Sequence, residues 1–257
     1  MVVGEALSVS RAVRAVPMHE RMRPDGGMRV FLTVRWPGDR PPGPCDRWLP
    51  ALAAPPGPNP SEAALRAWLA LPEQSAALRA AGELAAATDI TLTADPGDPV
   101  SAHMPLIRAA VVEQALWVVG EGALQRTRRF DAILFHAPSL AAPLIVGVPD
   151  EDDVLATFAE AVMASGQELV ADGEEEAAGR SPQCYLGLRS VVALPLVDGG
   201  ERVGALVAES GQIGRFSARE LDPIRELAAR AARLLAGGAV TAITAPPGGL
   251  ALGLPWR

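Results

Sequence analysis

Cysteine and histidine can supply a nucleophile, a redox pair or a metal site, and the chain has few of them. It contains two cysteines, Cys45 and Cys184, and three histidines, His19, His103 and His136. Two distant cysteines exclude a disulfide framework and a cysteine-rich zinc site. The histidines never occur at a metal-ligand spacing such as HxxxH. The sequence therefore predicts no metal site and no catalytic residues.

The motifs of the common catalytic and nucleotide-binding folds are absent from the sequence. There is no GxxxxGK[ST] phosphate loop, no GxSxG nucleophile elbow and no protein-kinase signature. The acidic run from Asp150 to Asp153 has two interpretations, a cation site or the first turn of a helix, where the helix dipole favours negative charge. The second interpretation needs no ligand, and we adopt it.

Composition sets the broad class of the protein. The chain has 257 residues, a formal net charge of −7 and 49% apolar residues, which suffice for a buried core. The acidic balance argues against nucleic acid as a partner, because binding phosphates requires a surplus of Lys and Arg. No N-terminal stretch resembles a signal peptide, and no uncharged run reaches the roughly 18–20 apolar residues of a spanning helix. We therefore expect a cytoplasmic protein without membrane insertion.

The N-terminal part of the chain divides by pattern into three segments. Residues 1–36 contain one strand signal, the alternating run from Met28 to Trp36. Residues 37–60 hold nine prolines and are predicted to form a linker without helix or sheet, acting as a spacer or a docking arm. Residues 61–100 are predicted to be helical, with Pro72 dividing a leucine-rich run into two helices.

Residues 105–236 show the clearest succession of elements. Helices are predicted at 106–120, ended by Gly120 and Gly122, at 150–165, closed by Gly166, and at 217–236, opened by a capping box from Ser217 to Glu220. Strands are predicted at 130–137, 144–148, 167–171, 190–197 and 202–209, the last two joined by an Asp-Gly turn. Neighbouring strands joined by tight turns form antiparallel sheets. The expected fold is therefore α+β, an antiparallel sheet flanked by helices.

Three sequence runs in this region are typical of a known family. They read MASGQELVAD, YLGLRSVVALPLVDGGERVGALVAES and FSARELDPIRELAARAARLL. These runs resemble the GAF domain pattern, in which a strand leads through a variable loop to a hairpin and a final helix. Matching positions are Gly166, Asp172, Gly187, Leu188, Arg189, Ser190, Pro195, Leu196, Gly204 and Phe216. The region 105–236 thus resembles GAF modules of bacterial signalling proteins, with a Pro-rich N-terminal extension and an apolar C-terminal tail.

The resemblance implies a non-catalytic protein, either a small-molecule sensor or a protein-interaction and assembly subunit. A GAF ligand cavity lies between the sheet and the variable loop. The candidate ligand-binding residues there are Phe135, His136, Asp172, Tyr185 and Arg189. Core packing without any ligand is the alternative interpretation of these residues.

Most special functions of the family do not transfer to this sequence. The NKxxFxxxDE motif of cyclic-nucleotide-binding members cannot occur, because the chain has no lysine. Cys184 lies only three residues before Gly187, whereas the bilin-bearing cysteine of phytochromes lies further upstream. A haem-binding role for His136 and a thiol-dependent reductase using Cys184 are the open alternatives, of which the reductase is the main one. No cofactor is expected.

Association with other chains is expected at two places. GAF-like domains commonly pair through their first and last helices, which makes Leu221 and Leu235 candidate contacts of a homodimer. The Pro- and Gly-rich tail 237–257 carries the large apolar residues Leu250, Leu252, Leu254 and Trp256, which favour docking on another subunit of a larger assembly. Folding of the tail over its own domain is the alternative.

Overall fold

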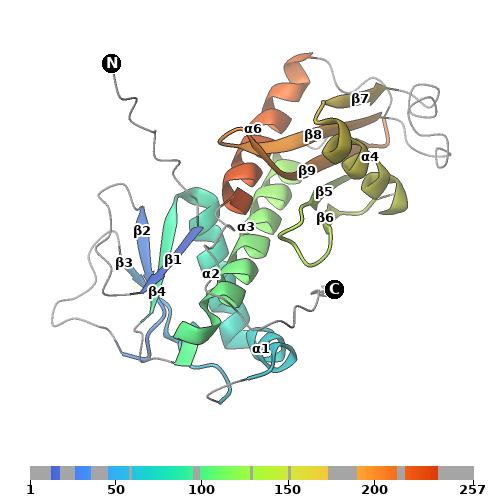
Figure 1. Ribbon diagram of the computed structural model, residues 1–257. Coiled ribbons are helices and arrows are strands. Elements are labelled where there is room, and N and C mark those ends of the chain that lie inside the picture. The colour runs from blue at the N-terminus through green and yellow to red at the C-terminus, as the bar shows by residue number, and fades with distance from the viewer. Residues whose placement is uncertain are drawn as a thin grey trace, which may run out of the picture. The chain divides into compact units, whose positions relative to one another are not determined.

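The chain folds into two compact units, Met1–Arg108 and Ala109–Arg257 (Figure 1). The computed structural model describes residues 13–17, 27–35, 46–57, 60–94, 99–127, 130–149, 152–172, 190–212 and 218–236. Helix α3, Met104–Thr127, begins in the first unit and continues into the second. No helix in the described ranges combines the length and the apolar character that crossing a bilayer requires.

A parallel sheet forms the centre of the first unit. Its strands β1 (Val13–Pro17), β2 (Met28–Phe31), β3 (Asp46–Trp48) and β4 (Ile90–Ala94) have the order β1-β4-β2-β3. Each neighbouring pair is parallel, and every residue of β4 is buried. The unit also contains the 3-10 helices η1 (Pro50–Leu52) and η2 (Pro99–His103) and the helices α1 (Glu62–Leu69) and α2 (Pro72–Ala87).

Helices α1 and α2 begin where the sequence predicts. Ser61 caps α1, because its hydroxyl accepts a hydrogen bond from the Ala64 backbone N–H at 3.2 Å. Pro72 is the first residue of α2, a position where the backbone N–H has no intrahelical acceptor and its loss carries no penalty. The division of this run into two helices is therefore confirmed.

The first unit differs from the sequence prediction in two strands. The tract 37–60, expected to form neither helix nor sheet, contains β3 and η1. Strand β3 is short and pairs only with β2 at the edge of the sheet, where flanking prolines are tolerated. The segment 61–100, expected to be helical, ends in β4, whose Ile and Thr residues suit a buried parallel strand. The strand predicted from Met28 to Trp36 ends at Phe31.

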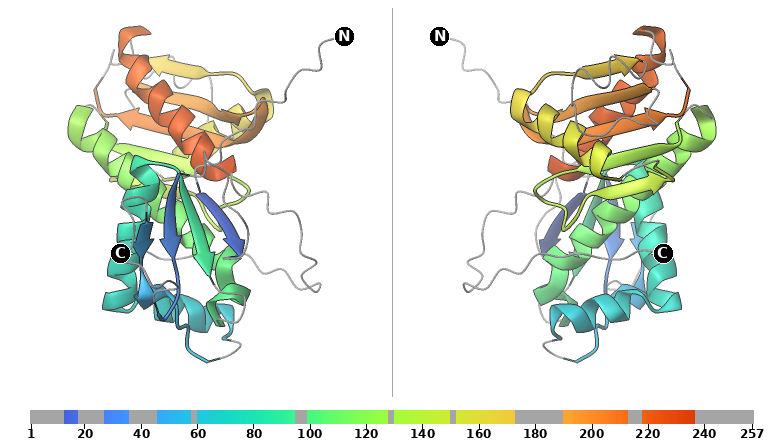
Figure 2. Two further views of the ribbon diagram at one scale, coloured as in Figure 1. Left: turned by 90° about the vertical axis from the view of Figure 1, so that its left-hand side faces the viewer. Right: turned by 90° about the vertical axis from the view of Figure 1, so that its right-hand side faces the viewer.

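An antiparallel sheet forms the second unit, as the sequence predicts. Its strands are β5 (Ala132–His136), β6 (Leu144–Gly147), β7 (Leu169–Asp172), β8 (Ser190–Asp198) and β9 (Glu201–Ser210), in the order β6-β5-β9-β8-β7. All neighbouring pairs are antiparallel. Helix α4 (Asp152–Ser165) covers one face and helix α6 (Ala218–Ala236) covers the other (Figure 2). This is the α+β architecture expected for a GAF-like sheet.

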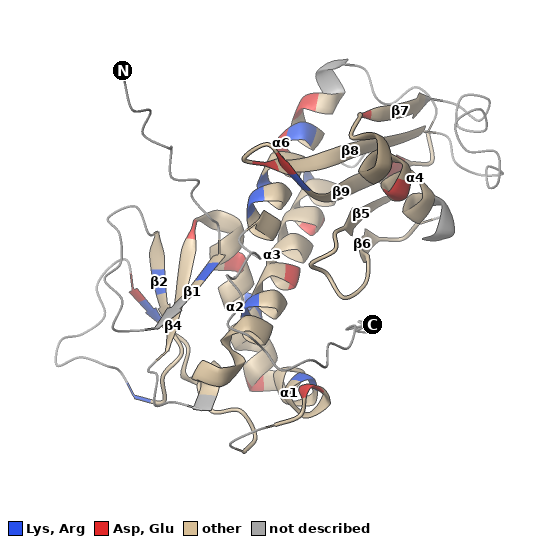
Figure 3. Cartoon of the chain, viewed as in Figure 1, with Lys and Arg blue, Asp and Glu red and all other residues tan. Residues whose placement is uncertain are grey.

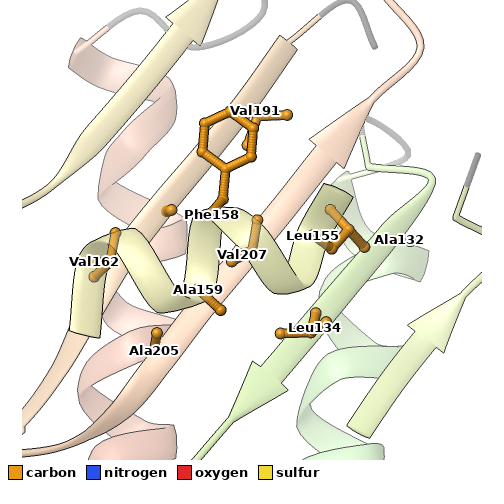
Figure 4. Close-up of a cluster of buried hydrophobic side chains, with 10 residues drawn as sticks. Ala132, Leu134, Leu155, Phe158, Ala159, Val162, Val191, Ala205 and Val207 are labelled. Carbon is orange, nitrogen blue, oxygen red and sulfur yellow. The ribbon is translucent and has the colours of Figure 1, made fainter. Parts of the chain in front are cut away.

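The sheet face under α4, here called the α4 face, carries a closely packed apolar core (Figure 4). Successive strand residues point to opposite faces, so alternate positions of each strand contribute to it. None of its members is more than 1% exposed; they are Leu155, Phe158, Ala159 and Val162 of α4 and Ala132, Leu134, Val191, Ala193, Ala205 and Val207 of the strands.

Helix α3 continues past the two glycines that were expected to end it. Gly120 and Gly122 both lie within Met104–Thr127, and neither has a positive φ. A glycine inside a helix costs about 1 kcal/mol relative to alanine, so tertiary packing has to offset it. A Cβ atom at Gly120 would lie 3.0 Å from Cγ2 of Val146 and 3.1 Å from Cε2 of Phe135. Gly120 therefore allows α3 to approach β5 and β6 closely.

Glycines with positive φ form two of the predicted chain reversals. Gly199 and Gly200 join β8 to β9 with φ values of 57° and 87°, as a type I′ hairpin turn requires. Gly166 has a φ of 71°, and its N–H donates to the Val162 carbonyl at 2.8 Å to end α4. Arg202 Nη1 donates to the Met163 carbonyl at 2.6 Å, so β9 also holds the end of this helix.

Candidate functional site

Polar residues of the second sheet gather at one of its ends, here called the loop end. At the loop end β5 and β8 begin, while β7 and β9 finish. The pairing places Asp172 beside Ser190, and Ser190 opposite Ser210. Residues 173–189, which connect β7 to β8, lie outside the described residues. The loop end is therefore the place where the variable loop of the sequence pattern joins the sheet.

Glu209 is a buried carboxylate on the α4 face at the loop end. Its register partners Ala132 and Val191 both belong to the apolar core under α4, so strand alternation places Glu209 on the same face. It is 2% exposed, and within the described part of the second unit it is the only buried charged residue. A carboxylate withdrawn from water needs a compensating hydrogen bond or cation. Glu209 has an interaction partner within its own chain, and it marks the loop end as a buried polar position.

One backbone hydrogen bond and two hydrogen bonds between side chain and backbone fix the strand end that carries Glu209. The N–H of Asp131 donates to the Glu209 carbonyl at 3.0 Å, and the Asp131 carboxylate accepts from the N–H of Gly211. Ser190, which is fully buried, donates its hydroxyl to the Gln212 carbonyl at 2.8 Å. These bonds tie β5 and β8 to the end of β9, so the Glu209 side chain starts from a fixed backbone.

The structure does not bring Phe135, His136 and Asp172 together. Phe135 is fully buried on the face opposite α4, close to Gly120 of α3. His136 lies on the α4 face but at the other end of the sheet, opposite Ala205. Asp172 pairs with Ser190, whose partner on β9 is Ser210. His136 and Asp172 are therefore level with Ala205 and Ser210 of β9, which lie about 17 Å apart at the usual rise of a strand. No single cavity can be lined by all three residues.

His136 has a buried ring nitrogen. Its Nδ1 atom is buried, and the described part of the chain offers it no hydrogen-bond partner.

Twelve of the residues singled out from the sequence lie outside the described ranges, so the structure places none of them: these are Cys45, Cys184, Tyr185, Gly187, Leu188, Arg189, Phe216, Ser217, Leu250, Leu252, Leu254 and Trp256. In the described ranges, no three His, Cys, Asp or Glu side chains converge as metal ligands would.

Leu221 and Leu235 serve the fold of their own chain. Helix α6 packs on β8 and β9, and the two side chains are only 6% and 3% exposed. Their burial within the single chain is explained by the packing of α6 on the sheet, and their role as dimer contacts stays a prediction. An amphipathic helix has one broad apolar face, and here the sheet occupies it.

Glu209 was missed by sequence reasoning, although the sequence carries a signal for it. In the strand from Arg202 to Ser210, alternate positions Ala205, Val207 and Glu209 share one face. A charged residue that continues an apolar face at the end of a strand is an exception to binary patterning, and such exceptions are expected at functional sites.

Comparisons with known proteins place these observations in context. A family model described as GAF domain matches residues 67–236, more than half of the chain. No curated protein matches the chain.

Several solved structures are similar to it. One is the type II free methionine-R-sulfoxide reductase from Thermoplasma acidophilum, 13% identical, covering 50% of this chain and 94% of that protein, with a TM-score of 0.42. A GAF domain/HD domain protein from Geobacter sulfurreducens is 18% identical, covering 49% and 92%, with a TM-score of 0.37. The third GAF domain of Slr1393 from Synechocystis sp. PCC6803 is 13% identical, covering 47% and 90%, with a TM-score of 0.36.

Proposed function

The chain belongs to the GAF domain family, and from this premise we propose that it is a non-catalytic sensor that binds a small molecule at the loop end of the second sheet. GAF domains bind small ligands or mediate interactions, so the proposal assigns the first of these roles. The observation that carries it is the GAF domain match over residues 67–236, together with the buried polar residues Ser190, Glu209 and Ser210 at the loop end.

The surroundings of Glu209 favour a particular ligand chemistry. A carboxylate in a site of low dielectric pairs best with a protonated amine, a guanidinium or a strong hydrogen-bond donor. The neighbouring positions on the same face, Ala132 and Val191, are fully buried in the apolar core under α4. The proposed ligand is a small cationic or donor-bearing molecule.

Two other functions remain as alternatives to the sensor. A reductase using Cys184 requires a thiol whose pKa neighbouring cations depress, and such a thiol reacts with iodoacetamide well below pH 8. An assembly subunit requires a stable partner. Alkylation of the native protein across pH tests the first alternative, and native mass spectrometry of the full chain from its producing cell tests the second.

Thermal unfolding with a panel of metabolites tests the sensor. A ligand present at about 100 times its Kd stabilises the folded state by about 2.7 kcal/mol. For a chain of this size, each kcal/mol raises Tm by about 2–4 °C, so a true ligand raises it by roughly 5–10 °C. We expect the active compounds to be cationic or rich in hydrogen-bond donors. We expect the Glu209→Gln substitution to abolish the increase in Tm that these compounds cause.

A matched variant separates recognition from a general change in charge. Glu160→Gln removes an exposed carboxylate of α4 and should leave every ligand-induced shift intact. If no compound of the panel stabilises the protein, or if Glu209→Gln responds to the active compound as wild type does, the sensor proposal fails. A thiol that reacts rapidly at pH 6 would instead support the reductase.

A further inference from the structure

Strand β7 has only a limited hold on the second sheet. Among the described strands it pairs with β8 alone, over the residues Leu169–Asp172, and so lies at the edge of the sheet (Figure 1). Leu169 and Val170 are partly exposed, and the fully buried Ala171 has a small side chain. Burial stabilises in proportion to the apolar area removed from water, so these residues contribute little. Local opening of such a strand does not require the rest of the sheet to unfold.

The connection from α4 to β7 combines an anchored helix end with a glycine. Arg202 of β9 donates from Nη1 to the carbonyls of Met163 at 2.6 Å and Ala164 at 3.4 Å, which holds the end of α4. Gly166 follows with a φ of 71°. A glycine permits changes of backbone direction that other residues resist. Residues 166–168 are therefore the point about which β7 can turn while α4 stays in place.

An ion pair ties the start of β7 to helix α6. Glu168, the residue before β7, accepts hydrogen bonds from Arg225 of α6 on both carboxylate oxygens. Nη2 of Arg225 lies 2.9 Å from Oε1 and 3.2 Å from Oε2, and Nε lies 3.3 Å from Oε2. Two nitrogens and two oxygens thus take part, and a bidentate arrangement of this kind makes an arginine–carboxylate pair directional.

The pair connects elements from opposite faces of the sheet. Helix α4, which leads to Glu168, covers one face, and α6 covers the other, so the contact goes around the edge at β7. Charged residues of both signs lie along α6 (Figure 3). Asp222 also approaches Arg225, at 3.5 Å, but it belongs to the same helix and holds nothing else in place. The contact with Glu168 is therefore the one that links β7 to α6.

Solvent exposure limits the strength of this contact. The side chains of Arg225 and Glu168 are 47% and 32% exposed, so water and salt screen their attraction. A pair of this kind shifts a local equilibrium by roughly twofold to fivefold. Such a shift is too small to unfold the sheet, but it changes the detached population of a short edge strand by the same factor.

We propose that β7 is a detachable strap, latched in its paired position by the ion pair between Glu168 and Arg225. When the pair opens, β7 turns about residues 166–168 and separates from β8. The contact of Arg202 with the end of α4 persists, so α4 and the core beneath it stay in place.

Detachment of β7 changes which backbone groups the sheet offers at the loop end. Pairing with β7 covers the outer edge of β8 from Ser190 to Ala193, and Ser190 lies at the loop end. This edge becomes available when β7 leaves. Because Arg225 belongs to α6, access to the edge depends on the position of that helix. The inference needs no ligand, so failure of its test leaves the sensor proposal untouched.

Native-state hydrogen exchange of the full chain, followed by NMR, tests the strap. In the wild type, we expect the amides of β7 to exchange faster than those of β5 and β9. Glu168→Gln and Arg225→Gln should each accelerate the exchange of β7 by roughly twofold to fivefold. The double variant should match either single variant, because the two substitutions remove the same interaction. Added NaCl should accelerate the exchange of β7 in the wild type and not in these variants.

A matched control separates the latch from a general change in charge. Asp222→Asn removes the other carboxylate beside Arg225, 72% exposed, and should not accelerate the exchange of β7. The proposal is overturned if β7 exchanges as slowly as β5 and β9 in the wild type, or if neither variant of the ion pair accelerates it. Equal acceleration in every strand of the sheet would also overturn it, because the pair would then stabilise the whole unit and not a strap.

Discussion

Alanine at two neighbouring glycines of α3 gives a direct measure of how closely this helix packs on the second sheet. Gly120 and Gly122 have the same helical conformation, so alanine should gain the same helix propensity at both, about 1 kcal/mol. Their surroundings differ. A Cβ at Gly122 would meet only the end of the Arg126 side chain, at 4.0 Å, whereas one at Gly120 would lie 3.0–3.1 Å from Val146 and Phe135.

The two substitutions should therefore differ in sign or size. Gly122→Ala should stabilise the protein by about 1 kcal/mol. At Gly120 the same gain is opposed by overpacking, which costs about 1–3 kcal/mol when a methyl group enters a packed core. The expected difference in the free energy of unfolding between the two variants is thus about 1–3 kcal/mol, with Gly120→Ala neutral or destabilising.

Urea denaturation followed by far-UV circular dichroism measures this difference, and amide hydrogen exchange of β5 and β6 locates it. Both variants share the unfolded-state effect of replacing glycine, so the comparison isolates packing in the folded state. Equal effects of the two substitutions would refute the close approach of α3 to β5 and β6. Destabilisation by Gly122→Ala would show that the helix ends at this point after all.

Three further substitutions test the second unit. Gly166→Ala places a side chain at a φ of 71° and should destabilise the protein by about 1–2 kcal/mol. Gly200→Ala is the control, because Gly200 has a φ of 87° but open space around it, so its Cβ does not touch Arg202. A larger decrease in Tm for Gly166→Ala than for Gly200→Ala therefore reports the contact between residue 166 and Arg202. Leu221→Arg buries a charge in the interface of α6 with the sheet and should destabilise by more than about 4 kcal/mol. Size-exclusion chromatography with circular dichroism checks this: a folded variant with altered self-association would instead support Leu221 as a dimer contact.

Local sequence signals predicted most elements of the second unit. The hairpin of β8 and β9 follows from two alternating runs around an Asp-Gly turn, and both glycines have the positive φ that this turn requires. The end of α4 follows from Gly166, because the position after the helix requires a positive φ, which glycine adopts easily for lack of a side chain. Capping, turn and periodicity signals act over a few residues, so they can be read before the tertiary fold is known.

The first unit was predicted poorly because its strands depend on distant partners. β1 pairs with β4, and β4 in turn pairs with β2, although about 60 residues of sequence separate β2 from β4. β3 has three residues within a Pro-rich tract and gains its regular structure only from β2. Parallel pairing of this kind joins segments that are remote in sequence, so no local pattern announces it.

The candidate site shows the same division between local and tertiary information. By itself the sequence determined that alternating strands, glycine turns and an amphipathic last helix would build an antiparallel sheet with helices against it, since these features follow from backbone geometry and local propensity. The predicted strand 130–137 also implied that Phe135 and His136 face opposite sides of the sheet. Only the tertiary structure decided that Asp172 lies at the other end of the sheet from His136, and that Glu209 is buried beside Val191 and Ala132. Register and strand order fix which residues become neighbours, and both are set by pairing across the sheet, where the free energy comes from burying whole faces together and not from any single stretch of chain.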